Sequence, residues 1–276
     1  MLAREDGMSG GFSLDKFAQH PFYQEVNRRL VMLTQLRPGE HVVDLGAGTG
    51  AVTRLLAEQV RNHNGTVIAV EPSESAIEVA RRNLENLTDV VVRFVQGSAE
   101  RFSQIVKKPV DAVFFCNAIH LVHEKADVMR QISEKLKDDG TFSFNTSFYL
   151  GAEPAESERF YKRWMMRALR FLRDEHGMSP DRTKVEARLR LTEDEYIDLL
   201  KSNGFNIRSR EVVTVQMPLE SFEDISEYSL WIEGVLPGVP LEIGAQALKH
   251  GAREAFEELG LESSPRNWLL VVANRA

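Results

Sequence analysis

The stretch His41–Gly50, HVVDLGAGTG, decides the fold class. Apolar, β-forming residues lead into Asp44, glycines occupy alternate positions over Gly46–Gly50, and a helix-patterned run, AVTRLLAEQV, begins at Ala51. This order predicts a strand, a tight turn and the N-terminus of a helix. Glycines suit the turn because a backbone without a Cβ atom bends sharply and lets a bound molecule approach the main chain.

A second apolar run, Thr66–Val70, ends beside Glu71. An acid at the tip of the second strand of a βαβ unit binds the two hydroxyls of a ribose. The two stretches together predict a site for a cofactor that carries adenosine. Gly46, Gly48 and Ala51 also satisfy the dinucleotide pattern G-x-G-x-x-G/A, so a nicotinamide cofactor stays open on spacing alone, as does a purely structural glycine turn.

The run Asp44–Gly50, DLGAGTG, resembles motif I of the class I S-adenosylmethionine (SAM) dependent methyltransferases, D/E-x-G-x-G-x-G. In that family an acid precedes the first glycine by two residues, where it orients the loop and offsets the cationic end of SAM. A loop that receives a pyrophosphate would instead repel a nearby carboxylate. The motif therefore favours a SAM-dependent methyltransferase. An NAD(P)-dependent oxidoreductase and a non-catalytic SAM-binding protein are the alternatives.

The composition is that of an ordinary globular protein of 276 residues, with 43% hydrophobic and 27% charged residues. The net charge of −7 argues against nucleic acid as a partner. The single cysteine, and the lack of His or acid clusters at ligand spacing, predict neither a disulfide nor a metal site. With no apolar run of membrane-spanning length and no signal-peptide core, we expect a cytoplasmic enzyme without a membrane span. The oligomeric state cannot be read from the sequence.

Short apolar runs alternate with helical patterns through the first half of the chain, which predicts a parallel sheet covered by helices on both faces. The fold class is therefore α/β, a Rossmann-like, mostly parallel sheet of seven strands with a helical cap from two insertions. The predicted strands are His41–Leu45, Thr66–Val70, Val90–Gln96, Ala112–Cys116, Thr141–Asn145, Ile207–Val215 and Trp268–Ala273. In the resembled fold the last of these is antiparallel.

The segments between and around these strands give the predicted domain organisation. It comprises an N-terminal helical lid (1–36), the SAM-binding core (37–145), a helical cap insertion (146–191), a core helix and strand (192–216), a second cap insertion (217–266) and the final core strand (267–276). Insertions of this length are read as helical because structureless loops of about fifty residues are rare.

The resemblance implies the cofactor contacts residue by residue. It places the methionine part of SAM, or of the product S-adenosylhomocysteine (SAH), on the motif I loop, the ribose on Glu71 and the adenine beside Pro72. The loop after the third strand, Gly97-Ser98-Ala99, has Ser98 where many family members have an aspartate for the adenine amine, so that contact is in doubt. The implied cofactor-binding residues are Asp44, Gly46, Ala47, Gly48, Gly50, Glu71, Pro72, Gly97, Ser98, Ala99 and Asn117.

His120 is the predicted catalytic residue. The run Asn117-Ala118-Ile119-His120 leaves the fourth strand beside the cofactor and is similar to the Asn-Ala-x-His of trans-aconitate-type methyltransferases. A base is needed only when the nucleophile arrives protonated, and His120 is placed to supply it. For a carboxylate nucleophile, His120 would position the acceptor by a hydrogen bond. A histidine with an ordinary loop role is the alternative.

The two insertions carry the residues expected to choose the acceptor. The first has an aromatic face around Trp164 and an opposite basic face over Arg159–Arg173, so we expect a small hydrophobic or anionic acceptor of the secondary-metabolite type. An amphipathic helix with a solvated basic face is the alternative. The predicted acceptor-binding residues are Tyr23, His120, Phe148, Trp164 and Trp231.

Overall fold

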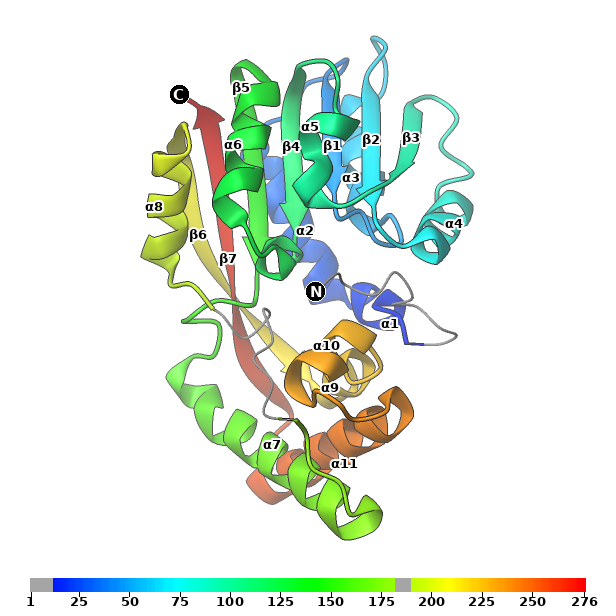
Figure 1. Cartoon of the computed structure of the whole chain (residues 1–276), viewed down its shortest axis with the longest axis vertical. Coiled ribbons are helices and arrows are strands. Elements are labelled where there is room, and N and C mark those ends of the chain that lie inside the picture. Colours follow the sequence, from blue (N-terminus) through cyan, green and yellow to red (C-terminus); the bar gives the residue numbers. More distant parts are fainter. Residues whose placement is uncertain (1–11, 182–189) are drawn as a thin grey trace.

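Seven strands form one sheet in the order β3-β2-β1-β4-β5-β7-β6 (Figure 1). The computed structural model describes residues 12–181 and 190–276, so the predicted lid residues 1–11 and cap residues 182–189 lie outside the described residues. The strands are β1 (His41–Leu45), β2 (Thr66–Glu71), β3 (Val91–Gln96), β4 (Val110–Cys116), β5 (Leu136–Thr146), β6 (Phe205–Pro218) and β7 (Ser263–Arg275).

The first five strands run parallel, and β7 is antiparallel to both neighbours, β5 and β6. The predicted seven-stranded, mostly parallel sheet with an antiparallel last strand is confirmed. The helices are α1 (Asp15–Ala18), α2 (Pro21–Thr34), α3 (Ala51–Val60), α4 (Glu74–Asn83), α5 (Phe102–Ile105), α6 (Lys125–Lys135), α7 (Ala155–His176), α8 (Glu193–Ser202), α9 (Leu219–Ile225), α10 (Ser229–Val235) and α11 (Leu241–Leu259).

Side chains of the central strands alternate between two hydrophobic layers, as the period of a strand requires. Val42 of β1 packs in the layer that contains α2 and α3, and its neighbour Val43 packs in the layer that contains α6 and α8. In β7, Leu270 and Leu269 divide between the same two layers. Helices therefore cover both faces of the sheet, and its ligand-binding edge is the one at the carboxyl ends of the parallel strands.

Three helices begin at residues that favour a helix N-terminus. Pro21 is the first residue of α2, where a missing N–H leaves no hydrogen bond unmade. The Ser73 side chain accepts from the Ala76 N–H at the start of α4. Thr192 and Glu195 form a reciprocal capping box at the start of α8, with N···O distances of 2.6 and 3.1 Å.

Strands β6 and β7 are longer than the sequence predicts. Phe205 of β6 pairs with Arg275 of β7 at one end, and Pro218 pairs with Ser263 at the other. The two-stranded ribbon therefore continues past the end of β5, which stops opposite Leu269. Strand β6 ends at Pro218 and β7 begins at Ser263, so the helices α9–α11 between them span 219–259. In Figure 1 the ribbon reaches from the sheet into a helical lobe made of α7, α9, α10 and α11.

The lobe is held together by close packing of α7 against α11. The Trp164 indole N–H donates to the Leu248 carbonyl at 2.7 Å. A Cβ atom at Gly251 would lie 2.7 Å from backbone atoms of α7, so glycine is required at this crossing. In the described segments, no helix combines the length and apolar character that crossing a bilayer would take.

Candidate active site

The loop after β1 is fastened to the neighbouring strand by backbone hydrogen bonds. The N–H groups of Gly46 and Ala47 donate to the Val70 carbonyl at 2.8 and 3.0 Å. Gly46, Gly48 and Gly50 all have positive φ, the left-handed region that favours glycine. A Cβ atom at Gly46 would lie 2.9 Å from Ala118, whereas one at Gly48 would project into open space. The loop thus leaves room for a ligand above Gly48.

Glu71 joins the end of β2 to this loop. Its carboxylate accepts from the Gly48 N–H at 2.9 Å and from the Ser73 N–H at 3.0 Å. Burial raises the pKa of Glu71 above its ordinary value, and the two backbone hydrogen bonds oppose that rise. Each carboxylate oxygen accepts one backbone bond and keeps a further lone pair, so both are able to accept from the hydroxyls of a ribose.

Asp44 is completely buried beneath the glycine loop. Its Oδ2 accepts from the Thr53 hydroxyl at 2.6 Å, whereas Oδ1 has no hydrogen-bond partner among the described residues. Burial raises the pKa of Asp44 to about 7, with the Thr53 hydrogen bond opposing the rise. A buried carboxylate with an unused oxygen is costly unless a cation or a donor reaches it, which fits the cationic methionine end of SAM.

The loop after β3 borders the same edge of the sheet. The Gly97 N–H donates to the Glu71 carbonyl at 3.1 Å, and a Cβ atom at Gly97 would lie 2.5 Å from Ile105. The Pro72 carbonyl accepts from the Gln96 side chain at 3.2 Å. Ser98 precedes a short 3₁₀ helix that begins at Ala99, and its side chain makes no capping bond there. The predicted adenine-side residues therefore lie together next to Glu71.

Asn117 is fixed at the carboxyl end of β4 by a buried network. Its backbone has φ +50°, its N–H donates to the Asn145 carbonyl at 2.9 Å, and its Oδ1 accepts from the Trp268 indole at 3.1 Å. Asn145 in turn donates to Asn27 at 2.8 Å. The Nδ2 group of Asn117 lacks a hydrogen-bond partner anywhere in residues 12–181 and 190–276. Its polar neighbour at the pocket is the Tyr23 hydroxyl, whose pKa is raised by burial and lowered by the Asn117 side chain.

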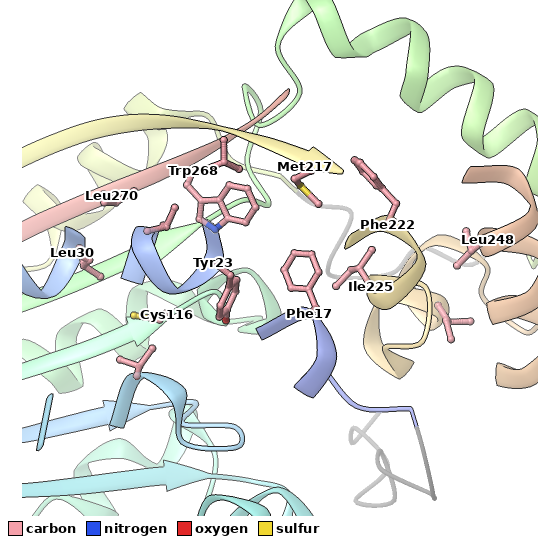
Figure 2. Packing of buried hydrophobic residues seen from close by; sticks show 14 of the residues in the cluster. Phe17, Tyr23, Leu30, Cys116, Met217, Phe222, Ile225, Leu248, Trp268 and Leu270 are labelled. Atoms are coloured by element: carbon pink, nitrogen blue, oxygen red, sulfur yellow. The ribbon is translucent and has the colours of Figure 1, made fainter. Parts of the chain in front are cut away.

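A pocket of about 520 Å³, counting the part open to solvent, lies between the sheet edge and the helical lobe. Tyr23, His120, Phe148, Trp164 and Trp231, the five predicted acceptor-binding residues, all line it, and so does Asn117. Figure 2 shows Phe17, Tyr23 and Trp268 facing Met217, Phe222 and Ile225 across this region. The other lining residues are not among the predicted acceptor-binding residues: Leu14, Phe17, Ser147, Tyr161, Met217, Phe222, Ile225, Tyr228, Arg266 and Trp268.

His120 is enclosed in the pocket wall, where 6% of its surface is exposed. Its ring stacks on that of Phe148, with centroids 4.0 Å apart. Burial lowers the pKa of His120 to about 3, and the positive charges of Lys125, Arg266 and Arg190 act in the same direction. Its Nδ1 has no partner in the part of the chain that the structure describes. His120 is therefore a neutral hydrogen-bonding group at physiological pH.

The basic face of α7 is largely balanced by carboxylates. Arg163 and Arg167 both pair with Glu258 of α11, and Arg170 lies 3.2 Å from Asp174. Half-buried and exposed pairs of this kind reduce the positive field that the helix presents. The basic face of α7 therefore offers an anionic acceptor less positive charge than its arginines alone would.

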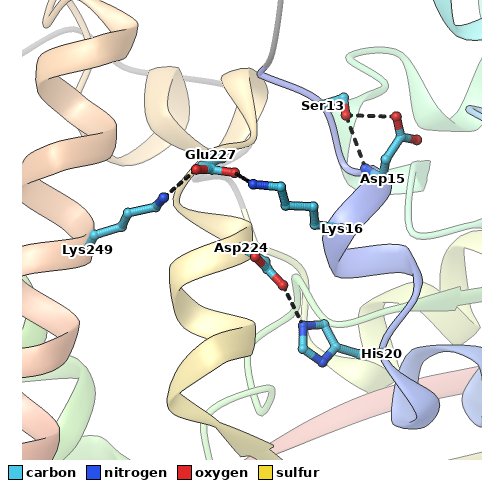
Figure 3. Close-up of polar contacts among 7 residues, drawn as sticks. All are labelled: Ser13, Asp15, Lys16, His20, Asp224, Glu227 and Lys249. Carbon is cyan, nitrogen blue, oxygen red and sulfur yellow. Dashed lines mark hydrogen bonds and ion pairs between the residues drawn. The ribbon is translucent and has the colours of Figure 1, made fainter.

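Ion pairs connect the N-terminal segment to the helical lobe (Figure 3). The Lys16 ammonium lies 2.7 Å from Glu227, which also pairs with Lys249, and His20 Nε2 lies 2.8 Å from Asp224. Phe17 and Tyr23 lie within the range predicted as the lid, and both are buried in the hydrophobic cluster that also contains Phe222 and Ile225 of α9. The segment α1–α2 thus closes one side of the pocket.

The sequence model of the family described as "Methyltransferase domain" matches residues 36–216, more than half of the chain. The chain belongs to this family. A demethylmenaquinone methyltransferase from Symbiobacterium thermophilum is 42% identical over 62 residues, which is 22% of this chain and 24% of that relative. A probable cobalt-precorrin-6B C(15)-methyltransferase from Sulfurisphaera tokodaii is 29% identical over 119 residues. This second match covers 42% of the chain and 58% of the relative, so the chain spans well under two thirds of both curated relatives.

Solved structures share the fold across nearly the whole chain. A cyclopropane synthase from Mycobacterium tuberculosis superposes with a TM-score of 0.60 at 16% identity, covering 96% of this chain and 94% of that one. A phosphoethanolamine N-methyltransferase from Haemonchus contortus, in complex with phosphomonomethylethanolamine and SAH, has a TM-score of 0.57 at 16% identity, covering 96% and 57%. The chain therefore combines a methyltransferase domain over residues 36–216 with the Rossmann-like fold of these structures.

Proposed function

We propose that this methyltransferase transfers the methyl group of SAM to a small, largely apolar molecule held in the aromatic pocket. The observation that carries the proposal is the position of the pocket. It is lined by Asn117 at the carboxyl end of β4 and closed on its other sides by the aromatic side chains of Tyr23, Trp164 and Trp231. Ligand sites of open α/β sheets lie at this edge, and apolar walls suit an apolar acceptor such as a secondary metabolite.

The cofactor site follows from the orphaned groups at the sheet edge. Glu71 would accept from the ribose hydroxyls, and the open space above Gly48 would receive the chain that joins ribose to sulfur. The unused oxygen of Asp44 would accept from the methionine amine. We assign Pro72, Gly97, Ser98 and Ala99 to the adenine side, with the adenine amine bound by backbone groups because Ser98 offers no charge.

SAM supplies an already activated methyl group, so the protein has to align the acceptor with it and exclude water. The pocket walls suit both tasks, since most of the lining side chains are aromatic and six of these are buried. His120 fits the positioning role better than the role of general base. A base is efficient when its pKa is near the working pH, and the pKa of His120 is lowered to about 3.

A variant that fills the pocket tests the proposal. Ile225 lines the pocket from α9, so Ile225→Trp should abolish methyl transfer to any acceptor that the wild type uses, with SAH affinity within about twofold of wild type. Leu169→Trp, at a half-exposed site on α7, is the matched control. Methyl transfer from deuterated SAM is followed by mass spectrometry on a panel of quinols, phenols and fatty acids. Full activity of Ile225→Trp would remove the pocket as the acceptor site.

A further inference from the structure

Among the residues described, those that line the pocket include several hydrogen-bond donors and no carboxylate. The indole N–H of Trp231 and the Nδ1 atom of His120 are buried without a hydrogen-bond partner in the described segments. The hydroxyl of Tyr161 lies within reach of the Arg266 side chain and keeps its own proton to donate. Tyr161 is 8% exposed, and its ring belongs to the aromatic wall. An unpartnered buried donor costs free energy, so such groups gathered at one cavity indicate a ligand rich in acceptor atoms.

A guanidinium group lies in the same wall. Arg266 is 4% exposed, and its guanidinium carbon lies 5.5 Å from the ring centroid of Phe148 and 5.3 Å from that of Tyr161. Its Nη2 donates to the Ser147 carbonyl at 2.6 Å. A guanidinium has five N–H donors, so the bond to Ser147 and the contacts with Tyr161 and Glu153 leave further donors for a ligand.

The nearest carboxylate only partly neutralises Arg266. Glu153 Oε1 lies 3.8 Å from Arg266 but 2.7 Å from Arg190, so one carboxylate serves two guanidinium groups. Arg190 borders the adjoining cavity, which shares His120, Phe148 and Trp231 with the main pocket. Of the described residues that line the two cavities, none is an aspartate or a glutamate. The surroundings carry an excess of buried positive charge that an anion would offset.

We propose that the pocket selects an acceptor that carries a carboxylate, bound by the guanidinium of Arg266 and the hydroxyl of Tyr161. This rests on the proposed function, and it names the substrate class for the same site. The planar fork of a guanidinium matches a carboxylate in a two-bond arrangement, and the stacked aromatic side chains enclose the apolar remainder of the molecule. The acceptor is therefore an aromatic or aliphatic acid rather than a neutral lipid or an amine.

Matched pairs of acid and amide test the assignment without altering the protein. SAH-saturated wild type is titrated calorimetrically with 3-phenylpropionate, indole-3-acetate and octanoate, and with the corresponding amides. We expect at least one acid to bind about tenfold or more tightly than its amide, because hydrogen bonds to a charged group are the stronger kind. Equal binding of acids and amides, or no binding of any acid, would overturn the proposal. Phenyl phosphate binding far more tightly than every acid would replace carboxylate with phosphate.

Variants separate recognition from a structural role of the buried arginine. Arg266→Met should reduce the acid-to-amide preference about 10-fold or more, and Arg266→Lys should retain part of it. Tyr161→Phe keeps the ring and should weaken only the acid, by several-fold. Arg163→Met, on the outer face of α7, is the matched control. An unchanged preference in Arg266→Met that still binds SAH would contradict the proposal, as would equal losses for acid and amide. Failure of the wild type to bind SAH would instead count against the proposed function.

Discussion

Glutamine at position 71 would remove one negative charge from the junction of β2 and the glycine loop. The carboxylate accepts from the backbone N–H groups of Gly48 and Ser73 at 2.9 and 3.0 Å. Glutamine keeps one acceptor oxygen and turns its amide N–H₂ toward a backbone donor, so one of these bonds is lost and a ribose hydroxyl loses its acceptor. Hydrogen bonds to charged groups contribute about 1.5–3 kcal/mol, and we expect Glu71→Gln to weaken SAH binding by about 2 kcal/mol.

Calorimetric titration measures this as a rise of about 30-fold in the SAH dissociation constant. Part of this loss comes from loosening of the glycine loop, and part from the ribose hydroxyl that loses its acceptor. The 2′-deoxy analogue of SAH, which lacks one ribose hydroxyl, separates these two contributions. Wild type should discriminate against the analogue, whereas Glu71→Gln should bind SAH and the analogue with closely similar affinity. Glu74→Gln, an exposed acid at the start of α4, is the control and should match wild type. SAH affinity of Glu71→Gln within twofold of wild type would refute the placement of the ribose.

Three further predictions concern charge and packing. The pKa of Asp44 is raised to about 7, and a bound ammonium would favour its charged form. SAH affinity should therefore fall by up to about tenfold per pH unit below 7. Calorimetry at pH 6 to 8 should show no such dependence in Asp44→Asn. The pKa of His120 is lowered to about 3 in the folded state. Below about pH 6.5 the unfolded state therefore binds more protons at this residue, and the free energy of unfolding of the wild type falls as the pH falls. His120→Gln should therefore gain up to about 1.4 kcal/mol relative to wild type per pH unit between 6 and 4 in urea denaturation, and a constant difference would contradict this. Trp164→Ala should lower the free energy of unfolding by about 3–5 kcal/mol, whereas Met166→Ala on the exposed side of α7 should change it by less than about 0.5.

The cofactor half of the molecule was predictable because its signals are local. Asp44 and Glu71 stand at the ends of adjacent parallel strands, and strand–turn–helix chemistry alone places such residues on one edge of a sheet. The first five strands and the capping box at Thr192 follow from patterns a few residues long. Three aromatic residues of the pocket could be predicted for a similar reason, since each belongs to an insertion that follows a strand: Phe148, Trp164 and Trp231.

Arg266 escaped prediction because its position depends on pairing between distant strands. The run Ser263–Asn267 contains Pro265 and polar side chains, which does not resemble a buried strand. In the structure this run pairs with β6 beyond the end of β5, where β7 has a strand on one side and tolerates a missing N–H. That extension carries Arg266 into the pocket. The sequence of α7 alone indicates a strongly basic face. Its neutralising partner Glu258 belongs to α11, so no local pattern could predict the pairing with Arg163 and Arg167.

A crystal structure of the SAH complex tests the central claim most directly. The account predicts the ribose on Glu71, the chain to sulfur above Gly48, and the sulfur directed past Asn117 toward the pocket bounded by His120 and Trp164. The methyl group of SAM would then point at a molecule enclosed by the aromatic walls. SAH bound elsewhere, or with its sulfur directed away from that pocket, would contradict both the cofactor site and the acceptor site proposed for this methyltransferase.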